Sequence, residues 1–332
     1  MLLSTETIII GAGLSGLAAA SVLVDAGRSV LLVDKGRGVG GRLATRRIGD
    51  ATLDHGAQFF TVRGETFRTR IDRAMTEGVV EVWCNGFSGD DGFPRYFCPD
   101  GMTALAKWMA ADLRASGVTI ATAERATAIE QTETGWSLPF ESETVLSAPN
   151  VISTAPVPQT LDLIDAGNIE LAPSTRTALD SISYKPTMAL LVTLDGPSAL
   201  AAPGGVQRTE DDMFTFVSDN HLKGVSETPA LTFHVNGQVS TDRWDDDPAI
   251  VIADLLLEAE PWIGDAPIVD VQLKTWKYAG PYTPHPDRYV AARTNPGHLI
   301  VAGDAFGGPK VEGAFNSGVA AGQAIAATAS ST

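Results

Sequence analysis

Short, continuous apolar runs lie near both ends of the chain. Three of them, Thr7–Ile10, Val30–Val33 and Leu299–Ala302, have the length and apolar content of strands buried on both faces of a parallel sheet. The first is followed by Leu17–Ala26 and the third by Val311–Ala327, and both of these segments have helical composition. The two ends of the chain therefore predict an α/β arrangement with a mainly parallel sheet.

Longer apolar runs fill the middle of the chain, between loops rich in Pro, Gly and Asp. Ile250–Glu260 is typical of a helix, and Ala126–Glu130 of a short strand. Four runs are typical of antiparallel strands: Met188–Leu194, Phe214–Ser218, Leu231–Val235 and Val269–Trp276. The predicted fold class is therefore α/β, with a Rossmann-type domain into which an α+β domain on a mainly antiparallel sheet is inserted. The predicted boundaries are 1–62, 100–157 and 286–332 for the Rossmann-type domain, and 63–99 and 158–285 for the inserted domain.

The composition indicates a folded chain and disfavours some classes of binding partner. Of the 332 residues, 44% are apolar and 19% are charged, which is enough to build a large core. The net charge of −16 disfavours nucleic acid and anionic membranes as partners, because their phosphates repel an acidic surface. Two cysteines cannot make a disulfide framework, so we expect a reducing compartment and a cytoplasmic location.

The apolar stretch near the N-terminus needs a separate interpretation. The sequence has no run of about 18 uncharged apolar residues, which a membrane span requires. Ile8–Val24 resembles the hydrophobic part of a signal peptide, but Glu6 precedes it and no basic residue does. The glycines of this stretch have a spacing that indicates a different role.

Gly11, Gly13 and Gly16 form a G-x-G-x-x-G motif directly after the first strand, and Asp34 ends the second strand. In such a motif the glycines allow a tight turn, a close approach of the backbone to a pyrophosphate, and close packing of helix on strand. The N-terminus of the following helix attracts the phosphates, and the acid binds ribose hydroxyls. A turn that serves packing alone would explain Gly16 but not Asp34. The motif therefore predicts a dinucleotide site.

Two further motifs favour FAD over a nicotinamide dinucleotide. Gly36–Arg42 contains four glycines, which would let the backbone lie along an extended cofactor. Near the other end of the chain, Gly303-Asp304 closes a strand and Val311–Ala314 opens the last helix, whose N-terminus can stabilise negative charge on a reduced flavin. A cofactor that contacts residues near both 11 and 304 must be long, and FAD meets that requirement better.

Together these motifs resemble the flavin amine oxidase superfamily. Within it, Asp34–Arg42, Leu53–Thr61 and Val311–Ala314 resemble the renalase family in particular. The resemblance implies that substrate and catalysis involve His234, Trp276, Tyr278 and Gln58. It implies FAD contacts from Gly11, Gly13, Ser15, Gly16, Asp34, Lys35, Gly41, Arg42, Gln58, Ala126, Thr154, Gly303, Asp304, Glu312, Gly313 and Ala314. Because Ala305–Lys310 lacks the cysteine that attaches flavin in some amine oxidases, we expect non-covalent FAD.

Other chemistry receives little support from the sequence. The histidines have no ligand spacing, and Cys84 and Cys98 are not a C-x-x-C pair, so no metal site is expected. A G-x-S-x-G nucleophile motif is missing as well. Amine oxidases often carry a lysine near flavin N5. Lys185 is the one candidate, and its sequence context does not support that role, which counts modestly against classical amine oxidation. Without the resemblance, His234 and Trp276 would be interpreted as core residues. The resemblance implies instead that they contact the substrate.

Basic side chains concentrate near the cofactor motifs. From Lys35 to Arg73 there are nine basic and four acidic residues, although the whole chain is acidic. FAD phosphates would engage one or two of the bases. The others either form an ordinary solvated face or attract a second anionic, nucleotide-like molecule.

The resemblance implies an oxidase that converts 2- and/or 6-dihydro isomers of NAD(P) to NAD(P)⁺ and reduces O₂ to H₂O₂, a form of metabolite repair. The expected partners are therefore a small nucleotide-like substrate and O₂. A dihydropyridine is already electron-rich and needs no base to remove a proton, which suits the few acid–base candidates. Two alternatives stay open: an amine oxidase or desaturase-like oxidoreductase, and a flavin-binding redox sensor without turnover.

Overall fold

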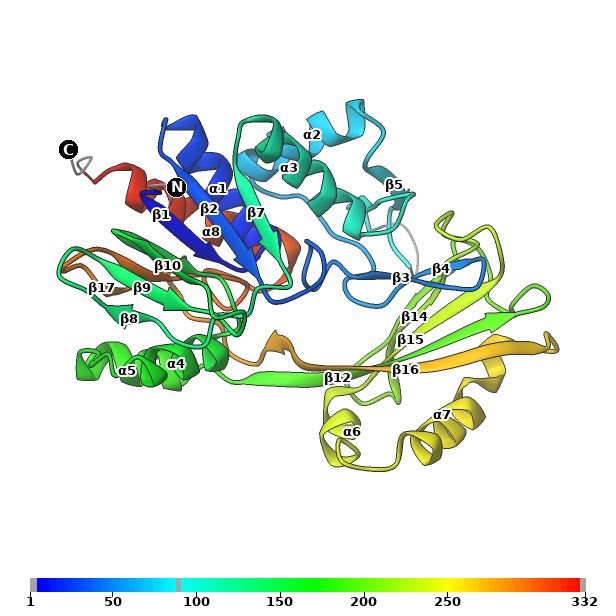
Figure 1. Cartoon of the computed structure of the whole chain (residues 1–332). Helices are drawn as coiled ribbons and strands as arrows, with labels where there is room; N and C mark the ends of the chain where they lie inside the picture. Colours follow the sequence, from blue (N-terminus) through cyan, green and yellow to red (C-terminus); the bar gives the residue numbers. More distant parts are fainter. Residues whose placement is uncertain (1–4, 88–90, 329–332) are drawn as a thin grey trace. The chain divides into compact units, whose positions relative to one another are not determined.

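The computed structural model describes residues 5–87 and 91–328 (Figure 1). Contacts between residues divide the chain into two compact units. Unit 1 consists of Met1–Gly41, Ala106–Ser183 and Gly280–Thr332. Unit 2 consists of Arg42–Leu105 and Tyr184–Ala279. Residues 42–62, 100–105, 158–183 and 280–285 thus group differently from the domains predicted above, whose boundaries stay a prediction.

Unit 1 is built on a six-stranded sheet. Its order is β17 (Val290–Arg293), β18 (Leu299–Val301), β11 (Asn150–Ser153), β1 (Thr7–Ile10), β2 (Val30–Asp34) and β7 (Thr119–Thr122). All neighbours pair in parallel except β17 with β18. Every residue of β1 is buried, as expected for a central parallel strand covered on both faces. The short apolar runs were therefore correctly interpreted as parallel strands.

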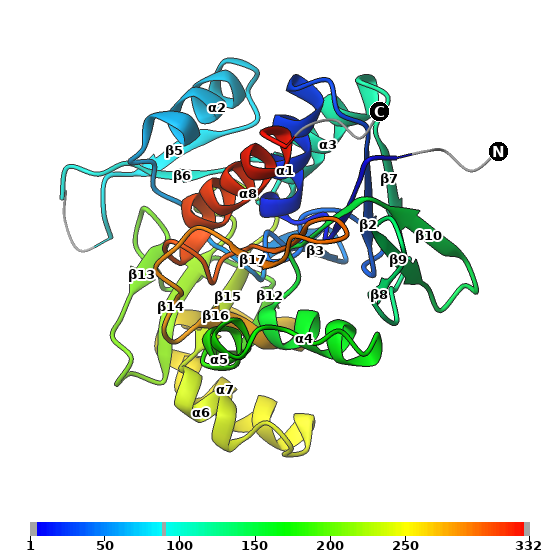
Figure 2. The same cartoon turned by 90° about the vertical axis from the view of Figure 1, so that its left-hand side faces the viewer.

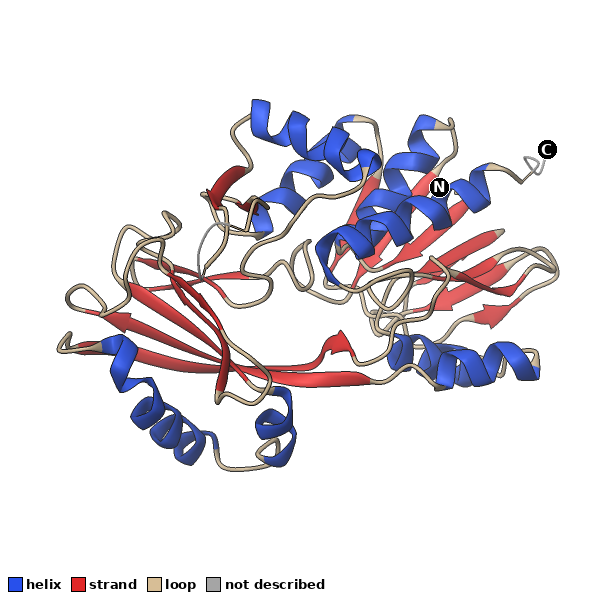
Figure 3. Ribbon diagram, turned by 180° about the vertical axis from the view of Figure 1, so that it is seen from behind, coloured by secondary structure: helices blue, strands red, loops and turns tan. Residues whose placement is uncertain are grey.

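Helices α1 (Leu14–Asp25) and α8 (Lys310–Ala326) lie side by side on one face of this sheet (Figure 3). Glycines allow their close contact: a Cβ on Gly318 would lie 1.9 Å from the Ser15 carbonyl oxygen, and one on Gly322 would lie 2.8 Å from that of Ala19. Unit 1 also contains most of α3 (Thr103–Ala115), a sheet of β8 (Glu130–Gln131), β9 (Trp136–Pro139) and β10 (Val145–Ala148), and helices α4 (Val157–Ala166) and α5 (Pro173–Asp180) (Figure 2).

Unit 2 is built on a five-stranded sheet. Its order is β13 (Gly205–Gln207), β14 (Phe214–Asp219), β15 (Ala230–Val235), β12 (Tyr184–Leu194) and β16 (Ile268–Pro281). The pairs β13–β14, β14–β15 and β12–β15 are antiparallel, which confirms the prediction for the middle of the chain. One face packs on the apolar side of α7 (Pro248–Ile263), close to α6 (Gly237–Asp242). The unit also contains α2 (Glu65–Thr76), β5 (Glu81–Cys84) and β6 (Arg95–Phe97).

The other face of the five-stranded sheet is covered by a hairpin of β3 (Thr45–Ile48) and β4 (Ala51–Asp54). Ile48 and Leu53 of the hairpin pack on Ala189 and Leu191 of β12. This hairpin leads directly into the loop that carries Gln58, so it positions that residue on the sheet.

The predicted fold class is confirmed, with one error among the elements. The strand expected at Ala126–Glu130 is wrong over most of its length, because Ala126 makes only an isolated bridge to Phe140 and regular pairing starts at Glu130. In the part of the chain that the structure describes, no helix is long and apolar enough to cross a membrane.

Candidate active site

Two of the three motif glycines are required by the turn itself. Gly11 has φ +104°, and a Cβ there would lie 2.5 Å from Thr154 Oγ1. A Cβ on Gly16 would lie 1.9 Å from the Gly11 carbonyl oxygen. Thr154 Oγ1 donates a hydrogen bond to the Ile10 carbonyl at 3.0 Å and so ties this turn to the adjacent strand. Any larger residue at Gly11 or Gly16 would push the turn apart.

Gly13 is different, because the turn does not need a glycine there. A Cβ on Gly13 would meet no protein atom within 4 Å. Gly13 is also the N-cap of α1, and neither a side-chain cap nor an acidic residue in the first turn satisfies the free N–H groups of that helix. The Ser15 hydroxyl beside them is buried and has no hydrogen-bond partner. Open space, free donors and an unpaired hydroxyl fit a pyrophosphate at this helix N-terminus.

Asp34 links the two glycine loops of unit 1. Its Oδ2 accepts a hydrogen bond from the Ala12 amide at 2.7 Å, and its Oδ1 accepts one from the Gly36 amide at 2.6 Å. The Gly40 amide in turn donates to the Ala12 carbonyl at 2.9 Å. Each carboxylate oxygen keeps further acceptor capacity, so ribose binding by Asp34 is compatible with its role in the loops and stays a prediction.

Several other FAD candidates of unit 1 lie at strand ends and at the start of α8. Gly303 has φ +135°, and its amide donates to Ser317 Oγ at 2.8 Å. A Cβ on Gly313 would lie 1.8 Å from the Gly308 carbonyl oxygen, so the first turn of α8 requires glycine there. Lys35 Nζ donates to Gln159 Oε1 at 2.7 Å, and burial, followed by the nearby Arg125, lowers the pKa of Lys35.

The division of the chain sorts the predicted site residues into two sets. Unit 1 contains Gly11, Gly13, Ser15, Gly16, Asp34, Lys35, Gly41, Ala126, Thr154, Gly303, Asp304, Glu312, Gly313 and Ala314. Unit 2 contains Arg42, Gln58, His234, Trp276 and Tyr278. The first set holds only groups expected at FAD. The second holds the four residues expected at the substrate, of which Gln58 is expected at FAD as well, together with Arg42, which is expected at FAD. Their individual roles stay predictions.

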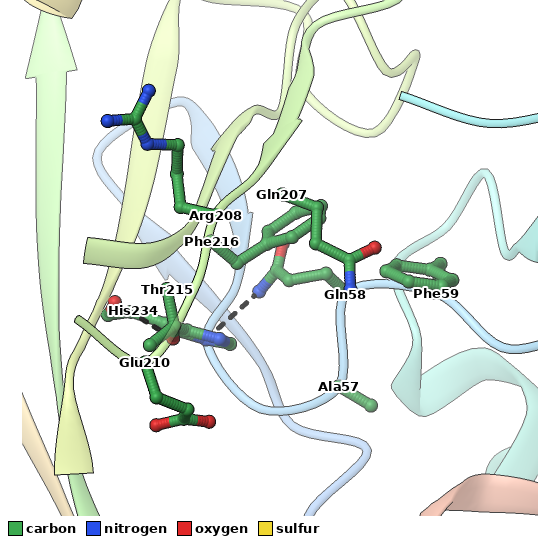
Figure 4. A pocket seen from close by; sticks show the side chains of 9 residues that line it. All are labelled: Ala57, Gln58, Phe59, Gln207, Arg208, Glu210, Thr215, Phe216 and His234. Carbon is green, nitrogen blue, oxygen red and sulfur yellow. Dashed lines mark hydrogen bonds between the residues drawn. The ribbon is translucent and has the colours of Figure 1, made fainter. Parts of the chain in front are cut away.

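Unit 2 has a pocket of about 270 Å³ on the hairpin side of its sheet (Figure 4). Gln58 enters it from the loop after β4, and His234 from β15. The pocket is lined by Ala57, Gln58, Phe59, Gln207, Arg208, Glu210, Thr215, Phe216 and His234. Gln58 Nε2 lies 3.4 Å from His234 Nε2 and 2.7 Å from the Asp54 carbonyl oxygen, to which it donates. Gln58 Oε1 is buried and has no hydrogen-bond partner.

The imidazole of His234 is neutral at physiological pH. Burial, with the neighbouring His55 as the second cause, lowers the pKa of His234 to about 4. Burial, followed by the charges of Arg46 and Lys274, lowers the pKa of His55 to about 4 as well. The pocket therefore presents an amide and a neutral imidazole to a ligand, without a cationic histidine.

Trp276 and Tyr278 share one face of β16, because side chains alternate along a strand. Trp276 Nε1 donates to the His55 carbonyl at 2.8 Å, and the two rings stack with centroids 5.3 Å apart. The Tyr278 carbonyl accepts a hydrogen bond from Arg42 Nη1 at 3.0 Å. Neither Trp276 nor Tyr278 lines the pocket, whereas Gln58 and His234 both do. The structure thus brings together two of the four predicted catalytic residues in the pocket and places Trp276 against His55, which lies next to His234.

A buried ion pair beneath the pocket has no counterpart in the sequence analysis. Lys223 Nζ lies 2.8 Å from Asp54 Oδ2, and both side chains are fully buried. Lys223 Nζ also donates to the Gln58 carbonyl at 2.5 Å, while Asp54 Oδ1 accepts from the Met102 amide at 2.8 Å. This network holds the Gln58 loop. Asp54 lies in the run that resembles the renalase family, but no local pattern marks Lys223.

Aromatic rings extend the wall of the pocket. Phe59 and Phe216, which line it, pack with Phe87 and Trp83 at centroid distances between 5.0 and 6.5 Å. Such a wall suits a flat, apolar ring system. Within residues 5–87 and 91–328, no group of three or more His, Cys, Asp or Glu side chains is arranged to hold a metal ion.

Comparison with known proteins gives the class of the molecule. Residues 9–71 match the family described as NAD(P)-binding Rossmann-like domain, and residues 79–326 match the family described as Flavin containing amine oxidoreductase. The chain belongs to the flavin containing amine oxidoreductase family, and it is an oxidoreductase. A flavin-containing family implies FAD as the cofactor.

Individual relatives narrow the comparison. Mouse (Mus musculus) renalase is 26% identical over 199 residues, which are 56% of this chain and 57% of renalase, so the chain spans little more than half the length of this curated relative. Cyclohexylamine oxidase from Brevibacterium oxydans IH-35A superposes with a TM-score of 0.72 at 18% identity, covering 97% of this chain and 99% of that one. Putrescine oxidase superposes with a TM-score of 0.68 at 16% identity, covering 98% and 100%. At such identities these two structures show a shared fold alone.

Proposed function

We propose that this flavoenzyme is an oxidase of 2- and/or 6-dihydro-NAD(P), which it converts to NAD(P)⁺ while O₂ is reduced to H₂O₂. The proposal rests on the similarity to renalase and on one feature of the pocket, the neutral pair of Gln58 and His234. FAD, when bound, supplies the hydride acceptor and passes the two electrons to O₂. The residues of the chain must then bind the dihydropyridine and orient it.

Gln58 fits the carboxamide of a nicotinamide ring. Its Oε1 is a buried acceptor without a partner, and an amide N–H of the substrate would satisfy it. Its Nε2 is already held by the Asp54 carbonyl and faces His234, so the orientation of the Gln58 side chain is set before a ligand binds. This preorganisation would fix the rotation of the substrate ring.

His234 fits the charge change of the reaction. Removal of a hydride from a neutral dihydropyridine leaves a cationic pyridinium ring. A protonated histidine beside that ring would oppose its formation, whereas an imidazole with a pKa of about 4 stays neutral and can still hydrogen-bond. Since no proton must be taken from the substrate, the pocket needs no general base.

The test is a product analysis under aerobic turnover. The FAD-loaded protein is supplied with the purified 2- and 6-dihydro isomers of NAD, with ordinary NADH and with an arylalkylamine. The proposal predicts one NAD⁺ and one H₂O₂ per isomer consumed, and no comparable turnover of the amine. Turnover of the amine with release of an aldehyde and ammonia, and none of the isomers, would instead establish amine oxidation.

A further inference from the structure

A pair of cations lies on the pocket side of unit 2, next to His55. Arg46 on β3 is opposite Leu53 on β4, so it shares the side of the hairpin that packs on the sheet. Lys274 on β16 alternates with Leu273, which packs on the opposite core, and therefore shares the face of Trp276. The charges of Arg46 and Lys274 both act on His55, and Arg46 acts on Lys274.

Within residues 5–87 and 91–328, neither cation has a partner of opposite charge. Among the residues that the structure describes, no carboxylate forms an ion pair with Arg46 or Lys274, and the Arg46 Nε–H is buried without an acceptor. Several other cations of this unit are paired with a carboxylate, namely Lys185 with Glu210, Arg208 with Asp212, and Lys223 with Asp54. Burial, followed by the charge of Arg46, lowers the pKa of Lys274.

We propose that Arg46 and Lys274 bind the pyrophosphate of the dinucleotide substrate; this inference rests on the proposed function. A phosphate group supplies the negative charge and the acceptor oxygens that both side chains lack, and an arginine fork beside an ammonium group is a common way to hold one. The position of the two cations relative to the pocket also fits the ribose and phosphates of the substrate. His55 contacts the pocket through His234 and lies beside both cations, so a nicotinamide ring at Gln58 and His234 would direct its ribose and phosphates along His55.

The proposal predicts that loss of the phosphate contacts weakens substrate binding without slowing hydride transfer to the flavin. In the FAD-loaded protein, Arg46→Gln and Lys274→Gln are each expected to raise the apparent Kd of 6-dihydro-NAD at least tenfold in anaerobic flavin reduction, with the limiting rate unchanged. The corresponding dihydronicotinamide riboside has the same ring and no phosphate, so its Kd should stay constant. Arg47→Gln is the matched control, because Arg47 is the exposed neighbour that points to the other side of β3.

A second measurement separates this inference from the proposed function. Calorimetric binding of inorganic pyrophosphate to the oxidised holoprotein should be detectable in the wild type and in Arg47→Gln, and lost in Arg46→Gln. If no dihydronicotinamide reduces the flavin, the proposed function fails, while pyrophosphate binding still decides the anion site. Equal effects on the dinucleotide and the riboside, absence of pyrophosphate binding, or loss of flavin from the Arg46 and Lys274 variants alone would overturn the site; the last result would assign these cations to FAD.

Discussion

The buried pair of Asp54 and Lys223 offers the sharpest test of how the pocket is held. The change is Lys223→Met, which keeps the apolar length of the side chain and removes its charge. Asp54 would then remain as a carboxylate with no exposed surface and no counter-ion, although the Met102 amide and Thr45 Oγ1, at 2.8 and 2.6 Å, still donate to it.

Breaking a buried ion pair from one side typically costs about 3–5 kcal/mol. Unfolding entropy of about 2.1 cal/mol/K per residue gives about 0.7 kcal/mol/K for a chain of 332 residues. The expected decrease in Tm is therefore about 4–7 °C if the chain unfolds as a whole, and more if unit 2 unfolds alone. Loss of the Lys223 hydrogen bond to the Gln58 carbonyl should also weaken substrate binding, because it releases the Gln58 loop.

The assay is thermal unfolding followed by circular dichroism at one fixed, saturating FAD concentration. Lys185→Met is the control: its partner Glu210 is exposed, so its loss should cost less than about 1 kcal/mol. Adding Asp54→Asn to Lys223→Met should recover part of the lost stability. A Tm within about 1 °C of the wild type for Lys223→Met, or strictly additive effects of the two changes, would refute the reasoning.

Three further predictions concern the cofactor and the histidines. Gly13→Ala should fold with an unchanged Tm as apoprotein but retain little FAD, because its Cβ meets no protein atom and would occupy the space of the phosphates; the flavin-to-protein absorbance ratio measures this. Asp304→Ala should likewise lower the flavin content, and an unchanged ratio would remove Asp304 from the FAD site. The pKa values of His55 and His234 lie near 4, below the ordinary value of 6.5, so the unfolded chain binds protons more readily than the folded one. The free energy of unfolding is therefore highest above pH 6.5 and decreases as the pH drops towards 4. At pH 5 the decrease is on the order of 2 kcal/mol per histidine. In His234→Asn, Tm should decrease less steeply with falling pH than in the wild type. An equally steep decrease of Tm in the variant would contradict the low pKa assigned to His234.

Local patterns explain why much of the fold could be predicted. A strand buried on both faces, such as Thr7–Ile10, is almost entirely apolar, and the turn at Gly11 and Gly16 leaves no room for a Cβ. Both constraints act within a few residues and are therefore visible in the sequence. The hairpin at 45–54 was not predicted, because its strands are only four residues long, mix polar with apolar residues and have no continuous apolar run.

The parts of the site that sequence reasoning missed depend on distant contacts. Asp54 and Lys223 are 169 residues apart, and Lys223 follows an ordinary polar turn. Arg46 lies in the basic segment Lys35–Arg73, which the sequence does mark, but Lys274 lies far outside it, and only the packing of the hairpin on the sheet makes the two cations neighbours. Gln58 was found through a family resemblance, whereas its unpaired Oε1 and its contact with His234 required the structure.

The most direct test of the account is anaerobic rapid-mixing absorbance of the FAD-loaded protein. The flavin band is followed after mixing with the 2-dihydro and 6-dihydro isomers of NAD, with ordinary NADH and with an arylalkylamine. The account predicts rapid bleaching by at least one of the isomers, and slow or no bleaching by NADH and the amine. Rapid bleaching by the amine, or by none of the four compounds, would contradict it.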